Sequence, residues 1–162
     1  MLDFGIPGYS PRWLSAFGDL ETAHGTRLRR LGGRRLTRCW VVWDRDDDTW
    51  FADCPVLLDF EGEQVEINHN KLDELSITWN SISTATEPRW PCGDFSLTWR
   101  DDAIQELTSL DGQTLDMAGL TAEANGSVTV TFAFPSVTLA VHNALDENGL
   151  AITDSQLNST DS

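Results

Sequence analysis

The sequence of 162 residues predicts a mainly β (α+β) domain made of two related helix-plus-β-meander halves. We expect these halves to be related by pseudo-two-fold symmetry and to form one twisted sheet or one sandwich. Three observations predict this class. β-branched and aromatic residues alternate with a period of two after residue 36. Clusters of Gly, Pro and Asp separate these runs at short intervals. Several motifs of the first half recur in the same order in the second half.

Helices are predicted mainly at the start of each half. Ser10-Pro11 is typical of an N-cap followed by proline at the first helical position, which predicts a short helix to about residue 22. A second helical stretch, residues 27–31, ends at Gly32-Gly33. A third is expected near residues 101–110, where apolar residues share one helical face.

A β-hairpin follows the first glycine pair. Residues 36–43 alternate as a strand, residues 50–54 form the opposite strand, and the polar stretch between them forms the turn. Centring the turn between Asp46 and Asp47 sets the register. The expected cross-strand pairs are Trp43–Trp50, Val41–Ala52 and Cys39–Cys54. Trp40 and Trp43 then lie on opposite faces, so we expect a second layer, such as the N-terminal helix with Trp13 and Phe17, to cover one face.

Seven further strands are predicted, with an irregular connection at residues 83–94. They are Val56–Phe60, Gln64–Asn68, Leu75–Trp79, Phe95–Arg100, Thr114–Leu120, Ser127–Phe134 and Val137–His142. Together these elements form one globular domain. Its expected parts are an N-terminal helical segment (1–26), a first β repeat (27–82), an irregular connection and strand (83–100), a second β repeat (101–153) and a flexible tail (154–162).

The internal repeat is carried by short matches. Leu31-Gly-Gly-Arg-Arg-Leu36 matches Leu110-Asp-Gly-Gln-Thr-Leu115. His69-Asn70 matches His142-Asn143, and the next motif, Leu72-Asp-Glu74, matches Leu145-Asp-Glu147. Leu75–Thr78 matches Leu150–Thr153. A single helix-plus-meander unit cannot bury its own apolar face, so two copies would share one core.

The formal net charge is −15, and it is unevenly distributed. Residues 1–38 carry +4 and residues 39–162 carry −19. This balance disfavours binding to nucleic acid or anionic lipid and favours a basic protein partner. The sequence contains no apolar run of membrane-spanning length and begins without a signal pattern, so we expect a cytoplasmic protein. The basic segment Arg27–Arg38 is expected to pair with the acidic surface of the chain itself or with a partner.

Motifs for catalysis or metal binding are weak. His69 and His142, each beside Asn and acidic residues, could form a ligand, metal or acid–base site where the repeats meet. The same residue types are typical of turns between strands, which is our preferred interpretation. Asp44, Asp46 and Asp48 have calcium-loop spacing, but Thr49 and Pro55 replace the required Gly and Glu. We therefore expect no metal, cofactor or catalytic residue.

The leading functional hypothesis is an immunity-type inhibitor. Acidic loops would steer a basic toxin or nuclease towards the protein, and aromatic side chains would anchor it. The expected contact residues are Asp44, Asp46, Asp47, Asp48 and Trp50 at the hairpin tip, with Asp73, Glu74, Asp146 and Glu147. An enzyme or ligand-binding protein using His69 and His142, and a nucleic-acid mimic, are the alternatives. Exposed tryptophan would equally suit a homodimer contact.

Overall fold

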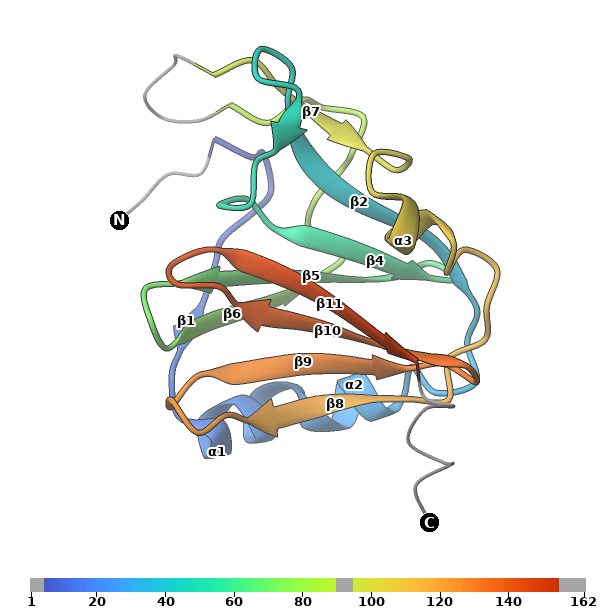
Figure 1. The fold of residues 1–162 in the computed structure, drawn as a ribbon. Helices are drawn as coiled ribbons and strands as arrows, with labels where there is room; N and C mark the ends of the chain where they lie inside the picture. The colour runs from blue at the N-terminus through green and yellow to red at the C-terminus, as the bar shows by residue number, and fades with distance from the viewer. Residues whose placement is uncertain (1–4, 90–94, 155–162) are drawn as a thin grey trace.

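The computed structural model describes residues 5–89 and 95–154, which form two antiparallel sheets packed face to face (Figure 1). The larger sheet contains β1 (Trp13–Leu14), β2 (Leu36–Asp44), β3 (Thr49–Trp50), β4 (Val56–Phe60), β5 (Glu63–Asn70), β6 (Glu74–Trp79) and β7 (Leu97–Arg100). The smaller sheet contains β8 (Met117–Ala122), β9 (Val128–Ala133), β10 (Val137–Asn143) and β11 (Asn148–Asp154). The predicted mainly β class is confirmed, and the two sheets form a sandwich.

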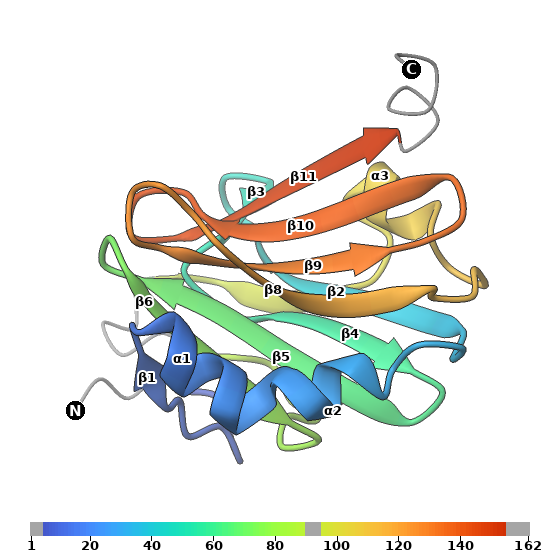
Figure 2. The same cartoon turned by 90° about the horizontal axis from the view of Figure 1, so that it is seen from below.

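A single apolar core lies between the sheets because their inward positions alternate with period two. Phe60 of β4 stacks on Phe132 of β9 with ring centroids 5.7 Å apart. A continuous helical segment made of α1 (Phe17–Leu20), the π-helical turn η1 (Glu21–Gly25) and α2 (Thr26–Arg29) runs alongside β8 (Figure 2). It buries Leu20 and Leu28 completely and so closes one open side of the sandwich.

The outer face of the larger sheet carries a second apolar cluster. Trp40 and Trp99 pack there against chain from the N-terminus and from the connection before β7. Trp43 instead packs against the main core, so the prediction that Trp40 and Trp43 face opposite ways is confirmed. The expected second layer also exists, but Trp13 reaches it from a strand, and Phe17 is 39% exposed.

The predicted helix beginning at Ser10-Pro11 is wrong in its first half. Trp13 and Leu14 form β1, which pairs with Ser76 and Leu75 of β6, and the helix begins only at Phe17. The backbone N–H of Arg12 donates to Ser76 Oγ at 2.9 Å. Pairing with the edge of β6 satisfies backbone groups that a helix would satisfy internally, and it places Trp13 on apolar surface. The expected break between two N-terminal helices is also absent, because η1 joins them.

The predicted hairpin is correct only beside its turn. Trp43 pairs with Trp50 as expected, but β3 ends there. The expected pairs Val41–Ala52 and Cys39–Cys54 are wrong, since Val41 pairs with Arg100 and Cys39 with Leu58. β4 takes the place beside Cys39 and β7 the place beside Val41, and these two strands bury more apolar surface there than residues 52–54 would. The strand expected at 114–120 also begins later, at Met117.

Both sheets contain four consecutive strands joined as an antiparallel meander. In the larger sheet these are β2, β4, β5 and β6, with the short β3 inserted, and in the smaller sheet they are β8 to β11. A gene duplication relating the halves stays a prediction from the sequence.

Asn148 is the main polar link between the sheets. This side chain at the start of β11 is 1% exposed. Its Oδ1 accepts the backbone N–H of His69 at 2.8 Å, and its Nδ2 lies 3.0 Å from Ala52 O and 2.9 Å from Cys54 O. β4 starts only at Val56, so the Asn148 amide takes the place of a strand beside this part of β5.

We predict that Asn148→Ala lowers the free energy of unfolding by about 3 kcal/mol, because it leaves the buried His69 N–H and the buried Cys54 carbonyl without this partner. The Ala52 carbonyl keeps its hydrogen bond from the backbone N–H of residue 148. Urea unfolding at neutral pH measures the loss. Asn143→Ala is the control: its Nδ2 donates to Lys71 O at the exposed turn, and we expect a loss below about 1 kcal/mol. Equal losses in the two variants would contradict the role given to Asn148.

Candidate interaction surface

Two turns from different sheets lie side by side at one end of the sandwich (Figure 1). The turn between β5 and β6 contains Lys71, and the turn between β10 and β11 contains Asp146. The Lys71 backbone N–H donates to Asp146 Oδ1 at 2.5 Å, and Asn143 Nδ2 donates to Lys71 O at 3.0 Å. The tertiary structure therefore brings together the two Leu-Asp-Glu motifs that the sequence singled out.

A third acidic segment joins the two turns. Asn148 binds the carbonyls of Ala52 and Cys54, which lie on either side of Asp53. Burial raises the pKa of Asp53, and the negative charges of Glu147 and Asp146 raise it further. Together these segments form a surface that we call the acidic corner. It consists of Asp53, Leu72, Asp73, Glu74, Leu145, Asp146 and Glu147.

Among the described residues, few positive side chains lie close enough to neutralise the carboxylates of the acidic corner. Lys71 is the only lysine of the chain, and its Nζ lies 3.2 Å from Glu74 Oε1. After burial, the negative charges of Glu147 and Asp146 raise the pKa of Asp53, so these two charges disfavour its ionised form. A positive charge placed beside them would relieve this repulsion.

Two leucines project from the same surface. Leu72 is 66% exposed and Leu145 is 78% exposed, higher fractions than for the other exposed large apolar side chains among the described residues. Neither side chain contributes burial to the core. Leucines surrounded by carboxylates are a candidate for apolar anchors within a charged rim.

The backbone at Leu145 is in an unfavourable conformation. Leu145 has φ +60° and Asp146 has φ +75°, as in the tight turns that favour Asn, Asp or Gly at both central positions. A leucine in the left-handed region costs about 1 kcal/mol. An exposed leucine in this conformation buries no apolar surface in the core that would offset the cost.

The hairpin tip, the first-choice site from the sequence, lies elsewhere on the molecule (Figure 1). Asp44 is 5% exposed, and its Oδ1 accepts the backbone N–H groups of Asp46 and Asp47 at 2.9 and 3.3 Å. Asp48 accepts the indole N–H of Trp43 at 2.9 Å. Asp44 and Asp48 thus hold the turn together, and Asp46 and Asp47 remain as exposed carboxylates at the tip.

Trp50 is half-buried and packs against the main core. It borders an apolar cavity of about 380 Å³ with Ile104 and Leu107 near α3 (Gln105–Thr108) and with Leu150 and Ile152 of β11. Every tryptophan among the described residues is buried or half-buried, so the most exposed apolar groups are the two leucines of the acidic corner.

The histidines are close together but on different faces. His69 is 2% exposed in the core, and its Nε2 lies 3.0 Å from the carbonyl of Val141 in β10. His142, the next residue of β10, lies over Gly149 on the outer side of the smaller sheet. Burial lowers the pKa of His69 to about 4, with the His142 charge acting in the same direction. His69 is therefore neutral at pH 7 and donates one structural hydrogen bond.

No group of three or more His, Cys, Asp or Glu side chains is placed to hold a metal ion within residues 5–89 and 95–154. Cys39 and Cys54 are buried free thiols whose pKa values are raised by burial, and Cys92 lies outside the described residues. Cys39 and Cys54 lack the exposure that a reactive thiolate needs.

Three of the six arginines of the basic segment Arg27–Arg38 form ion pairs within the chain. The acidic partners of Arg27, Arg29 and Arg38 are Glu63, Glu21 and Asp101. Arg30, Arg34 and Arg35 form no ion pair with a carboxylate of the described residues.

Sequence reasoning selected the carboxylates of the acidic corner but missed Leu72, Leu145 and Asp53. The signal for the leucines was present, because an apolar residue in an otherwise polar turn has no local structural reason. The sequence could not identify Asp53, since it joins the acidic corner only because Asn148 of β11 binds the carbonyls of the residues on either side of it.

Comparisons with known proteins identify no relative. No protein-family model, curated protein or solved structure matches this chain. No helix among the described residues is long and apolar enough to cross a bilayer.

We predict that stability falls on acidification through His69. Its pKa is about 6.5 when unfolded and about 4 when folded, so the unfolded chain binds the proton more tightly. Stability is complete above pH 6.5 and declines as the pH falls towards 4. At pH 5 the loss is about 2 kcal/mol relative to pH 7.5. Urea unfolding of wild type and His69→Gln over this range isolates the effect, and parallel curves would contradict it.

We also predict that Leu145→Asn raises the free energy of unfolding by about 1 kcal/mol, since asparagine tolerates the left-handed region better. Thermal and urea unfolding measure the gain. Leu72→Asn, in the neighbouring turn, is the control and should leave stability nearly unchanged. Destabilisation by Leu145→Asn would show that the leucine supports the fold.

Proposed function

We propose that the protein is a non-catalytic inhibitor of a basic protein, an immunity-type protein that neutralises a toxin or nuclease, with the acidic corner as its contact surface. The observation that carries the proposal is the meeting of two exposed leucines with five carboxylates from three separate segments. The carboxylates would steer a basic partner and accelerate association. Leu72 and Leu145 would enter an apolar site on that partner and slow dissociation.

The charge of the acidic corner favours a foreign partner over a second copy. A two-fold symmetric homodimer places the same patch against itself. Five carboxylates and one lysine on each side would then repel their counterparts. A basic partner removes this repulsion and also the repulsion felt by Asp53.

The other hypotheses have less support. His69 is enclosed in the core, which leaves no room for a substrate at its ring. A mimic of nucleic acid would need carboxylates in place of a phosphate chain, whereas the acidic corner presents leucines at its most exposed points. The proposal implies that the protein acts in the cytoplasm, where an intracellular toxin would be neutralised.

The test is co-expression with the product of the neighbouring reading frame, the usual source of a toxin for an immunity protein. We expect rescue of growth and a stoichiometric complex whose association slows at least tenfold at 0.5 M salt. Leu72→Ser with Leu145→Ser should weaken the complex at least thirtyfold, the effect of losing about 2 kcal/mol. Surface plasmon resonance measures both rates.

Two controls locate the surface. Met117→Ser removes an apolar side chain that is 59% exposed on β8 and should leave affinity unchanged. The double variant Asp46→Asn with Asp47→Asn should lower the association rate only slightly. A larger effect at the hairpin tip than at the leucines would overturn the assignment of the acidic corner. Absence of binding to the neighbouring product would overturn the immunity role.

A further inference from the structure

A cavity of about 500 Å³ lies between the start of β5 and the helical segment with the residues that follow it. Three arginines border it, although the chain as a whole carries −15. Its lining residues are Ala23, Thr26, Arg27, Arg30, Leu31, Arg34 and Glu63. The volume is in the range of sites for small metabolites.

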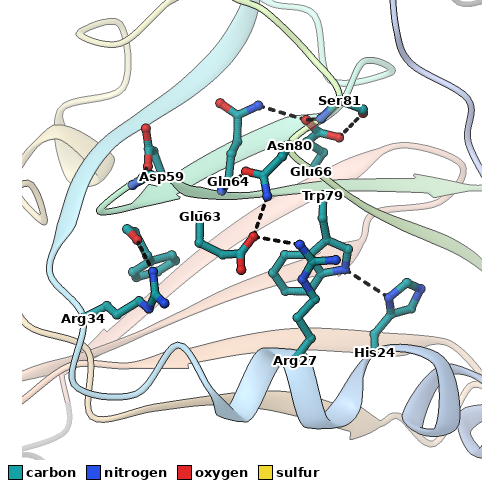
Figure 3. Close-up of polar contacts among 12 residues, drawn as sticks. His24, Arg27, Arg34, Asp59, Glu63, Gln64, Glu66, Trp79, Asn80 and Ser81 are labelled. Carbon is teal, nitrogen blue, oxygen red and sulfur yellow. Dashed lines mark hydrogen bonds and ion pairs between the residues drawn. The ribbon is translucent and has the colours of Figure 1, made fainter.

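One wall of the cavity is held in place by stacking and hydrogen bonds (Figure 3). The Arg27 guanidinium lies 4.5 Å from the ring centroid of Trp79, and its Nη2 donates to Glu63 Oε1 at 2.8 Å. The Trp79 indole N–H donates in turn to His24 Nδ1 at 3.2 Å. Arg27 is therefore ordered before any ligand binds, which lowers the entropy cost of using it.

The other two arginines keep hydrogen-bonding capacity. Arg34 Nη1 lies 3.5 Å from Phe60 O, a weak contact, and Arg30 has no ion pair with a carboxylate of the described residues. Each guanidinium carries five N–H donors in a planar fork that suits phosphate oxygens.

Of the described residues, Glu63 alone lines the cavity with an acidic side chain. Figure 3 shows its side chain between Arg34 and Arg27, and Asn80 Nδ2 also donates to its Oε1 at 2.5 Å. The hydrogen bond from Arg27 holds the pKa of Glu63 below its ordinary value, and the Arg34 charge contributes. The cavity thus already stabilises one anionic group.

We propose that this cavity binds the phosphate group of a small phosphomonoester through Arg30 and Arg34, with Arg27 completing the site. The ligand is compact, because the −19 charge of residues 39–162 opposes a long polyanion such as RNA. Glu63 limits affinity, since its carboxylate competes for the same guanidinium groups. This site is independent of the acidic corner.

Calorimetric titration with glucose 6-phosphate at pH 7.5 and low salt tests the proposal, with inorganic phosphate and a ten-nucleotide single-stranded RNA as separate probes. We expect glucose 6-phosphate to bind in the millimolar range or more tightly. Arg30→Gln with Arg34→Gln should weaken binding at least tenfold, and Glu63→Gln should strengthen it at least threefold. Tighter binding of RNA than of glucose 6-phosphate would overturn the proposal.

Matched variants separate a site from general electrostatics. Arg29→Gln with Arg35→Gln removes two positive charges, as the double cavity variant does, and Glu21→Gln removes one negative charge, as Glu63→Gln does. None of these three residues lines the cavity. Each should change affinity less than twofold. The proposal would be overturned if the control variants changed the affinity as much as the cavity variants do. It would also be overturned if the wild-type protein did not bind glucose 6-phosphate at 20 mM. If the double arginine variant does not fold, the effect of Glu63→Gln decides the outcome.

Discussion

The packing of the two sheets depends on hydrogen bonds to buried backbone groups of β5, at a point that the neighbouring strand β4 does not reach. β5 continues beyond the end of its neighbour, and its His69 N–H would lie unpaired in the core. Asn148 supplies the missing acceptor from the other sheet and at the same time holds the carbonyls on either side of Asp53. One amide side chain therefore sets how the smaller sheet sits on the larger one.

The surface chemistry follows from this junction. Because β11 begins at Asn148, the turn before it lies against the turn after β5, and Asp146 accepts the backbone N–H of Lys71. The like charges near Asp53 and a left-handed leucine both reduce stability. Features that disfavour folding are expected to persist where they serve binding, and here they occur together on two adjacent turns.

Basic and acidic side chains are separated in the folded structure as well as along the sequence. Three arginines of the basic segment Arg27–Arg38 form ion pairs with nearby carboxylates, and three, Arg27 among both sets, border a cavity. The acidic corner is contacted by the single lysine of the chain, Lys71, through Glu74. The same scaffold thus presents two surfaces of opposite character, so a basic protein and a small anion would not compete for one place.

By itself, the sequence determined the mainly β class, most strand positions, the Trp43–Trp50 pair and the acidic character of the turns. These depend on period-two patterns and turn residues within a few positions of each other, and local physics decides them. Only the tertiary structure decided that Trp13 joins a strand, that Leu72 and Leu145 project together, and that three arginines surround a cavity. Each of these depends on contacts between segments far apart in the chain, where burial of apolar surface and pairing of backbone groups outweigh local preference.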